Sequence, residues 1–149
     1  MNKYPHKEAE ALIQSVCEAA RNGEYDTREK FLSMLEDHPD IAAQGYNSFG
    51  KIFFWNKASA ELYGYSEAAA VNRDIFETIL PPDLRPLARS MVEAAVRTGK
   101  LPEPSPCDLL HRNGSYVTVY SGHLMFTWDG SSSPEFYCID AGIEEPQMD

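Results

Sequence analysis

Strand-like segments fall into two groups in this chain, and helical segments lie between them. The predicted strands are 40–46 and 51–55 in the first group, and 107–112, 115–128 and 135–143 in the second. The segments 51–55, 115–128 and 135–143 are rich in β-branched or aromatic residues, and turn-forming residues separate the segments. Strands at both ends of a chain with helices between them favour an α+β fold. We therefore expect an antiparallel sheet of five strands.

The turns and breaks support this order. The segment 51–55 carries four consecutive apolar residues, which is typical of a strand covered on both faces. Asn113-Gly114 is a strong hairpin signal between two of the later strands. Three prolines within 101–106 predict an extended connector rather than a helix.

Helix signals between the two groups of strands are closely spaced. Asn56, Ser66 and Asp74 can each cap a short helix, and Gly64 can end the first of them. A longer helix is predicted over 83–98. Its apolar face is expected to hold Leu84, Leu87, Ala88, Met91, Val92, Ala95 and Val96.

Two more helices are predicted before the first strand. Over 7–21 the apolar residues recur at spacings of three and four, which gives one stripe on a charged helix. The stripe consists of Ala9, Leu12, Ile13, Val16, Cys17 and Ala20. The second helix is expected to start with a capping box of Asp26 and Glu29. The stripe can pack on the open face of the sheet or pair with its copy in a second subunit, because both placements bury the same side chains.

Charge excludes some partners. The formal net charge is -10, from thirteen basic and twenty-three acidic residues. Nucleic acids and anionic membranes attract positive charge, so neither is an expected partner. The acidity is expected to serve solubility.

The cysteines and the apolar runs indicate a compartment. Cys17, Cys107 and Cys138 form no CxxC pair, so we expect neither a disulfide framework nor a metal site. The first residues lack the apolar core of a signal peptide, and no apolar run is long enough to span a membrane. We expect a cytoplasmic protein.

Several short motifs, taken in order, resemble the PAS family. The strand Gly50-Lys-Ile-Phe-Phe-Trp-Asn56 is followed by a helix that ends in Gly64-Tyr65-Ser66. Asn113-Gly114 precedes a long strand, and Cys138-Ile139-Asp140 lies near the end of the last strand. The resemblance implies a PAS-like sensory domain over 37–143, with short helices on one face of the sheet. Residues 1–36 would then be a helical extension that caps or dimerises the domain, and 144–149 a frayed tail. Asn56, Gly64, Tyr65, Ser66, Gly114 and Asp140 are the fold and signalling residues that it implies.

The resemblance also implies an internal cavity between the sheet and the short helices. Flavin-binding relatives place a reactive cysteine where this chain has Ile75, and carboxamides where it has Leu109, Val119 and Cys138, so a flavin adduct is not expected. Haem-binding relatives use a histidine on the long helix, and 84–98 has none. The cofactor therefore stays unnamed.

Candidate cavity residues follow from strand parity and from the resemblance, which places Trp55 and Ser59 where relatives contact a chromophore. They are Phe53, Trp55, Ser59, Ile75, Leu109, Val117, Val119, Ser121, His123 and Cys138. The alternative is that these side chains only fill the core.

Catalytic motifs are missing from the sequence: there is no Ser/His/Asp order, paired-histidine motif or phosphate-binding loop. The function that the resemblance implies is a bacterial-type signalling sensor. It would bind a small ligand as a homodimer and act on an output module such as a histidine kinase or a cyclic-dinucleotide enzyme. The alternatives are a ligand-free dimerisation module and, third, a small enzyme on this scaffold.

Overall fold

A five-stranded antiparallel sheet forms the centre of the molecule, and a sixth strand of two residues extends it. The computed structural model describes residues 3–144. The strand order is β3-β2-β6-β5-β4, and β1 pairs in parallel with the end of β6. The strands are β1 Lys3–Tyr4, β2 Ala42–Tyr46, β3 Ile52–Trp55, β4 Ser105–Leu110, β5 Tyr116–Phe126 and β6 Glu135–Ile143. The predicted α+β class and antiparallel sheet are confirmed. The extra strand β1 was not predicted, because two residues are too few to show a strand pattern.

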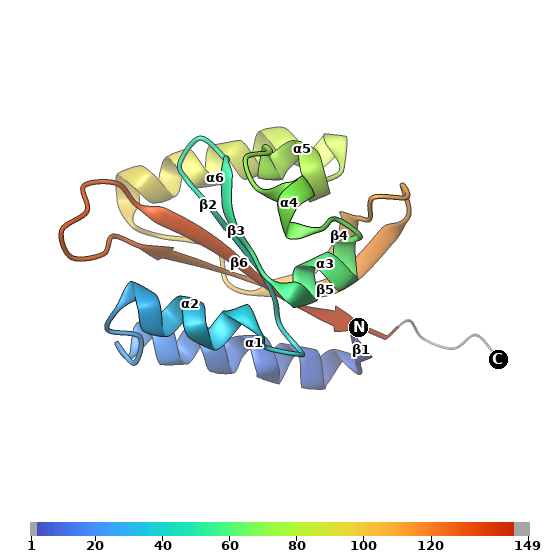
Figure 1. The fold of residues 1–149 in the computed structure, drawn as a ribbon, viewed down its shortest axis with the longest axis horizontal. Helices are drawn as coiled ribbons and strands as arrows, with labels where there is room; N and C mark the ends of the chain where they lie inside the picture. The colour runs from blue at the N-terminus through green and yellow to red at the C-terminus, as the bar shows by residue number, and fades with distance from the viewer. Residues whose placement is uncertain (1–2, 145–149) are drawn as a thin grey trace.

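Helices cover both faces of this sheet (Figure 1). We call the face under the two N-terminal helices the outer face and the opposite one the inner face. The outer face carries α1 His6–Arg21 and α2 Arg28–Glu36, and the inner face carries α3 Lys57–Tyr63, α4 Glu67–Ala70, α5 Ile75–Ile79 and α6 Arg85–Thr98. Each face has its own cluster of buried apolar side chains.

The apolar stripe of α1 packs on the outer face of the chain's own sheet. Ala9 and Ile13 are fully buried, and Cys17 is almost so. Of the two placements that the sequence left open, the structure has the first. A second subunit cannot use the same stripe while α1 lies there.

The predicted caps of the short helices are confirmed. The side chains of Asn56, Ser66 and Asp74 accept hydrogen bonds from backbone N–H groups two or three residues further on, at 3.0, 3.2 and 2.9 Å. Gly64 follows α3 with a φ of 82°, a left-handed conformation that glycine adopts at no steric cost.

The start of α2 differs from the prediction. Thr27 caps this helix, and its Oγ1 accepts a hydrogen bond from the Lys30 N–H at 3.2 Å. Asp26 lies one residue before the cap and forms an ion pair with Lys30 at 2.9 Å. The expected capping box with Glu29 is therefore wrong.

The region of the long helix also differs in detail. The predicted helix 83–98 divides into a 3-10 turn, Pro82–Leu84, and α6. Leu87 and Val96 are 70% and 52% exposed, so the apolar face is buried only in part. β4 begins inside the predicted proline connector, and Pro106 belongs to it. This is tolerated because β4 is an edge strand, which needs hydrogen-bond donors on one side only.

Candidate functional site

A small cavity opens between the inner face of the sheet and the helices α5 and α6. Its volume is about 160 Å³. The helical side, with the residues that join α5 to α6, contributes only apolar side chains: Ile79, Leu80, Leu84, Leu87, Ala88 and Met91. The sheet contributes Cys107, Leu109, Ser121, His123 and Cys138. Apolar cavities of about 150 Å³ hold a molecule the size of benzene, so this one is large enough for a small ligand.

The sequence-based candidates lie in three places. Leu109, Ser121, His123 and Cys138 lie in the cavity wall. Trp55, Ile75, Val117 and Val119 are buried in the inner-face core without lining the cavity. Ser59 is also fully buried. It does not line the cavity, and its hydroxyl donates a hydrogen bond to the backbone of β2.

Phe53 lies on the outer face, so its expected place beside the cavity is wrong. Gly45 pairs with Phe54 and Tyr46 pairs with Ile52, which leaves Phe53 as an extra residue in β3. Such a β-bulge breaks the alternation on which the prediction depended. The Phe53 ring lies over Gly45, where an added Cβ would be 2.9 Å from Phe53 Cζ. The Phe53 ring can lie in this position because Gly45 has no side chain.

Sequence reasoning missed the helical half of the wall. Strand parity selects residues on strands only, and it cannot say which helix side chains face the sheet. A usable signal existed, because the predicted apolar face of the helix 83–98 contains Leu84, Leu87, Ala88 and Met91, all of which line the cavity.

The titratable groups of the wall are neutral near neutral pH. Burial lowers the pKa of His123 to about 4 and raises the pKa of Cys107 to about 12. Burial also raises the pKa of Cys138 well above its usual value. His123 Nδ1 lies 3.6 Å from Cys138 Sγ. The wall thus offers weak hydrogen-bonding groups but no charge.

A buried carboxyl lies next to this wall. Asp140 on β6 is fully buried, and it accepts hydrogen bonds from the hydroxyls of Ser121, at 2.6 Å, and Tyr63, at 2.7 Å. Burial raises the pKa of Asp140 to about 6, and these donors, with the Gln44 amide, oppose the rise. Ser121 therefore belongs both to the cavity wall and to the shell of a buried acid.

The Gln44 side chain links this acid to α3. Its Nε2 donates to Ser59 Oγ at 2.9 Å, and Ser59 Oγ donates to the carbonyl of Ala43 at 2.9 Å. Gln44 Oε1 is buried and accepts no hydrogen bond from the described residues. Polar groups of β2, α3, β5 and β6 thus meet in one buried cluster.

Asn56 joins three segments of backbone. Its Oδ1 accepts from the N–H groups of Ala43 and Ser59, at 2.9 and 3.0 Å. Its Nδ2 donates to the carbonyls of Leu35 and Ile41, at 2.7 and 2.8 Å. The side chain is 1% exposed, so this is a structural connection between α2, β2 and α3.

The other motif residues lie directly after α3 and in the hairpin turn between β4 and β5. Gly64 leaves room for the His111 ring, which an added Cβ would approach to 2.5 Å. Tyr65 accepts the Trp55 indole N–H on its carbonyl at 2.9 Å. Ser66 caps α4, and Gly114 takes a φ of 89° in the predicted hairpin turn.

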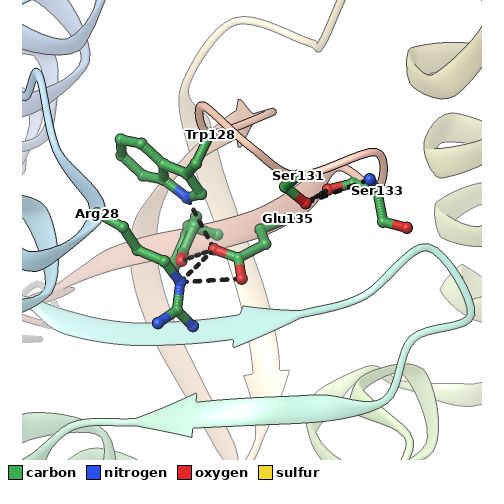
Figure 2. A network of polar contacts seen from close by, with 6 residues as sticks. Arg28, Trp128, Ser131, Ser133 and Glu135 are labelled. Carbon is green, nitrogen blue, oxygen red and sulfur yellow. Dashed lines mark hydrogen bonds and ion pairs between the residues drawn. The ribbon is translucent and has the colours of Figure 1, made fainter.

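A second polar network ties α2 to the hairpin between β5 and β6 (Figure 2). Glu135 accepts two hydrogen bonds from Arg28 Nε, at 2.9 and 3.0 Å. It also accepts from the Trp128 indole at 2.8 Å and from the Tyr137 hydroxyl at 2.6 Å. This network fastens the N-terminal helices to the sheet at the opposite face from the cavity.

Within residues 3–144, no group of three or more His, Cys, Asp or Glu side chains is placed to hold a metal ion. No helix in this part of the chain is long and apolar enough to cross a bilayer.

Several PAS domains of solved structure are similar in fold to this chain. A PAS domain from Colwellia psychrerythraea superposes with a TM-score of 0.65 at 21% identity, over 77% of this chain and 95% of the other. The PAS domain of Bordetella pertussis BvgS gives a TM-score of 0.61 at 15% identity, over 78% and 86%. The PAS domain of the Cronobacter turicensis RpfR quorum-sensing receptor, in complex with C12:0, gives 0.57 at 15% identity, over 72% and 98%.

At these low sequence identities the superpositions show a shared fold and nothing further. No curated protein matches the sequence. A family model described as the PAS fold matches residues 52–138, which is more than half of the chain. The chain belongs to the PAS fold family.

Proposed function

We propose that this chain is a sensory domain that binds a small, largely apolar ligand in the cavity under α6. PAS domains are in general sensory signalling modules without catalytic activity. The observation that carries the proposal is the cavity itself, which has apolar walls and few polar groups, as small-molecule sites do.

The wall suggests the chemistry of the ligand. Most of it is aliphatic, and its hydrogen-bonding groups, Ser121 and His123, gather on β5. A ligand with an apolar body and one polar group fits this arrangement. RpfR PAS domains, which share the fold, are in complex with C12:0 and with BDSF, and this supports the use of such a cavity for ligands.

β5 offers a route for the signal. Ser121 and His123 face the cavity, and Gly122 between them faces α1 on the outer side of the sheet. A ligand that shifts β5 would therefore move the surface on which α1 lies, and occupancy would favour one of two arrangements. We propose that α1 and α2, within 1–36, report the state of the domain 37–143.

The assignment to the PAS fold family supports a proposal about the wider setting. We propose a cytoplasmic, bacterial-type signalling system with an output module such as a histidine kinase or a cyclic-dinucleotide enzyme. The chain itself would catalyse no reaction. A homodimer stays a prediction, and it would need a surface other than the buried stripe of α1.

Native mass spectrometry of freshly purified protein tests the ligand proposal. A mass excess that disappears on denaturation is expected, and Ala88→Trp, which fills the cavity, should abolish it. Ser90→Trp is the control, because Ser90 is exposed on α6 and does not line the cavity. If the wild-type protein carries no excess and binds no small apolar probe added to it, the chain is a ligand-free interaction module instead.

A further inference from the structure

The single hydroxyl hydrogen of Ser121 can point to Asp140, to the Cys107 sulfur or into the cavity. Ser121 Oγ lies 2.6 Å from Asp140 Oδ1, and the same hydroxyl lines the cavity. A serine hydroxyl has a single hydrogen to donate and two lone pairs to accept with. While Asp140 is a carboxylate, that hydrogen points at the acid, and the cavity meets only the lone pairs of Ser121.

Protonation of Asp140 reverses this hydrogen bond. Tyr63 is buried and donates its only proton to Asp140 Oδ2, and a new proton on Oδ2 would make that oxygen a weaker acceptor for Tyr63. A proton on Oδ1 instead donates to Ser121 Oγ. The Ser121 hydrogen is then free to turn into the cavity, where a ligand acceptor can receive it.

We propose that Asp140 couples ligand binding to proton uptake through Ser121, so that the protonated domain prefers ligands with a hydrogen-bond acceptor, such as a carbonyl, at Ser121. This inference rests on the proposed function, because it concerns the ligand of the same cavity.

The groups around Asp140 leave it as the one that titrates. Tyr63 from α3, Tyr46 from β2, Cys107 from β4 and Cys138 from β6 all interact with its charge, and burial raises the pKa of each. These groups are therefore neutral in the pH range where Asp140 changes charge. None of the four described ion pairs involves Asp140. Its charge is balanced by hydrogen bonds alone, which makes protonation accessible.

Two neutral probes of nearly equal size separate the hydrogen bond from the apolar contact. Acetophenone carries a carbonyl acceptor and ethylbenzene does not, and neither titrates in the range used. Calorimetric titrations at pH values below and above about 6, the pKa of Asp140, measure both affinities. We expect acetophenone to bind about fivefold more tightly at the lower pH, the gain of one hydrogen bond. Ethylbenzene affinity should not change with pH.

Two variants give opposite expectations. Ser121→Ala removes the donor, so acetophenone should bind at the weaker level at both pH values. Asp140→Asn imitates the neutral acid, so acetophenone should bind at the tighter level at both. Circular dichroism checks that each variant is folded, and Ser121→Ala alone suffices if Asp140→Asn does not fold.

The outcomes distinguish this inference from the proposal beneath it. If both probes bind but acetophenone shows no pH dependence, or keeps it in Ser121→Ala, the coupling is refuted and the ligand site stands. If neither probe binds the wild-type protein at either pH, the ligand site is refuted and the coupling with it.

Discussion

Gly122 lies directly beneath Ile13 of α1. A Cβ added at Gly122 would be 2.7 Å from Ile13 Cγ2 and 3.0 Å from Cys17 Sγ, so α1 and β5 approach as closely as a glycine allows. A side chain at this position must push the helix away from the sheet. The packing of α1 on the sheet is therefore sensitive to substitution of a single residue, Gly122.

Gly122→Val should loosen α1 without disturbing the inner face. Overpacking of this kind costs about 1–3 kcal/mol of unfolding free energy, which urea denaturation measures. Hydrogen exchange should increase in α1 and stay unchanged in α6, which serves as the internal control. Equal increases in both helices would show that the two faces of the sheet do not respond separately.

Asn56→Ala should be among the most destabilising substitutions in the domain. It removes hydrogen bonds from four buried backbone groups, and each unsatisfied buried group costs about 1–3 kcal/mol. We expect a loss of at least about 3 kcal/mol in urea denaturation. Asn113→Ala is the control, because its side chain makes only exposed local bonds, and it should cost well under half as much. Similar losses in the two variants would contradict the structural role of Asn56.

Glu135→Ala should destabilise the protein more than Arg28→Ala. The first substitution strips the partner from Trp128 and Tyr137 as well as from Arg28. The second removes a half-exposed ion pair, which is worth about 0–1 kcal/mol, and the contact of the guanidinium with the Phe53 ring, at 5.4 Å from its centre. Thermal denaturation compares the two, and a larger effect of Arg28→Ala would show that the ion pair dominates the network.

Asp140 should make stability depend on pH. Its pKa is about 6 in the folded protein and 3.8 without perturbation, so the folded state holds the proton more tightly. The stabilisation is complete below pH 3.8 and is lost as the pH rises to about 6, after which both states are ionised. This difference of about two pKa units between the folded and unfolded states corresponds to about 3 kcal/mol of unfolding free energy.

Asp140→Asn isolates this effect from the other titrating groups. Between pH 4 and pH 7 the variant should gain about 2 kcal/mol relative to the wild-type protein, as measured by urea denaturation. Asp129→Asn, at an exposed turn, should show no such relative change. A pH-independent difference between Asp140→Asn and wild type would mean that Asp140 has an ordinary pKa.

Elements with local signals were predictable from the sequence. The caps of α3, α4 and α5 depend on one side chain and the backbone beside it, so Asn56, Ser66 and Asp74 reveal them directly. The hairpin at Asn113-Gly114 is equally local. The order of these elements, together with the short motifs that resemble the PAS family, was sufficient to suggest the fold.

The contents of the cavity wall depend on longer-range geometry. The bulge that moves Phe53 to the outer face arises where β3 pairs with β2, and the absence of a side chain at Gly45 permits it. The burial of Asp140 is similar, because only the folded sheet brings Ser121 and Tyr63 to its two oxygens. No pattern within one segment carries that information.

The pairing of β1 with β6 places the two ends of the described chain side by side. Tyr4 is the partner of Ile143, and the carbonyl of Tyr4 accepts the Glu144 N–H at 2.8 Å. Neighbouring strands are separated by about 4.8 Å. The domain could therefore be inserted into a surface loop of another protein if the two ends of that loop moved apart by little more than this distance. The fold is therefore suited to insertion into the surface loop of a reporter enzyme. In such a fusion, a change in the pairing of β1 and β6 would pull directly on the reporter.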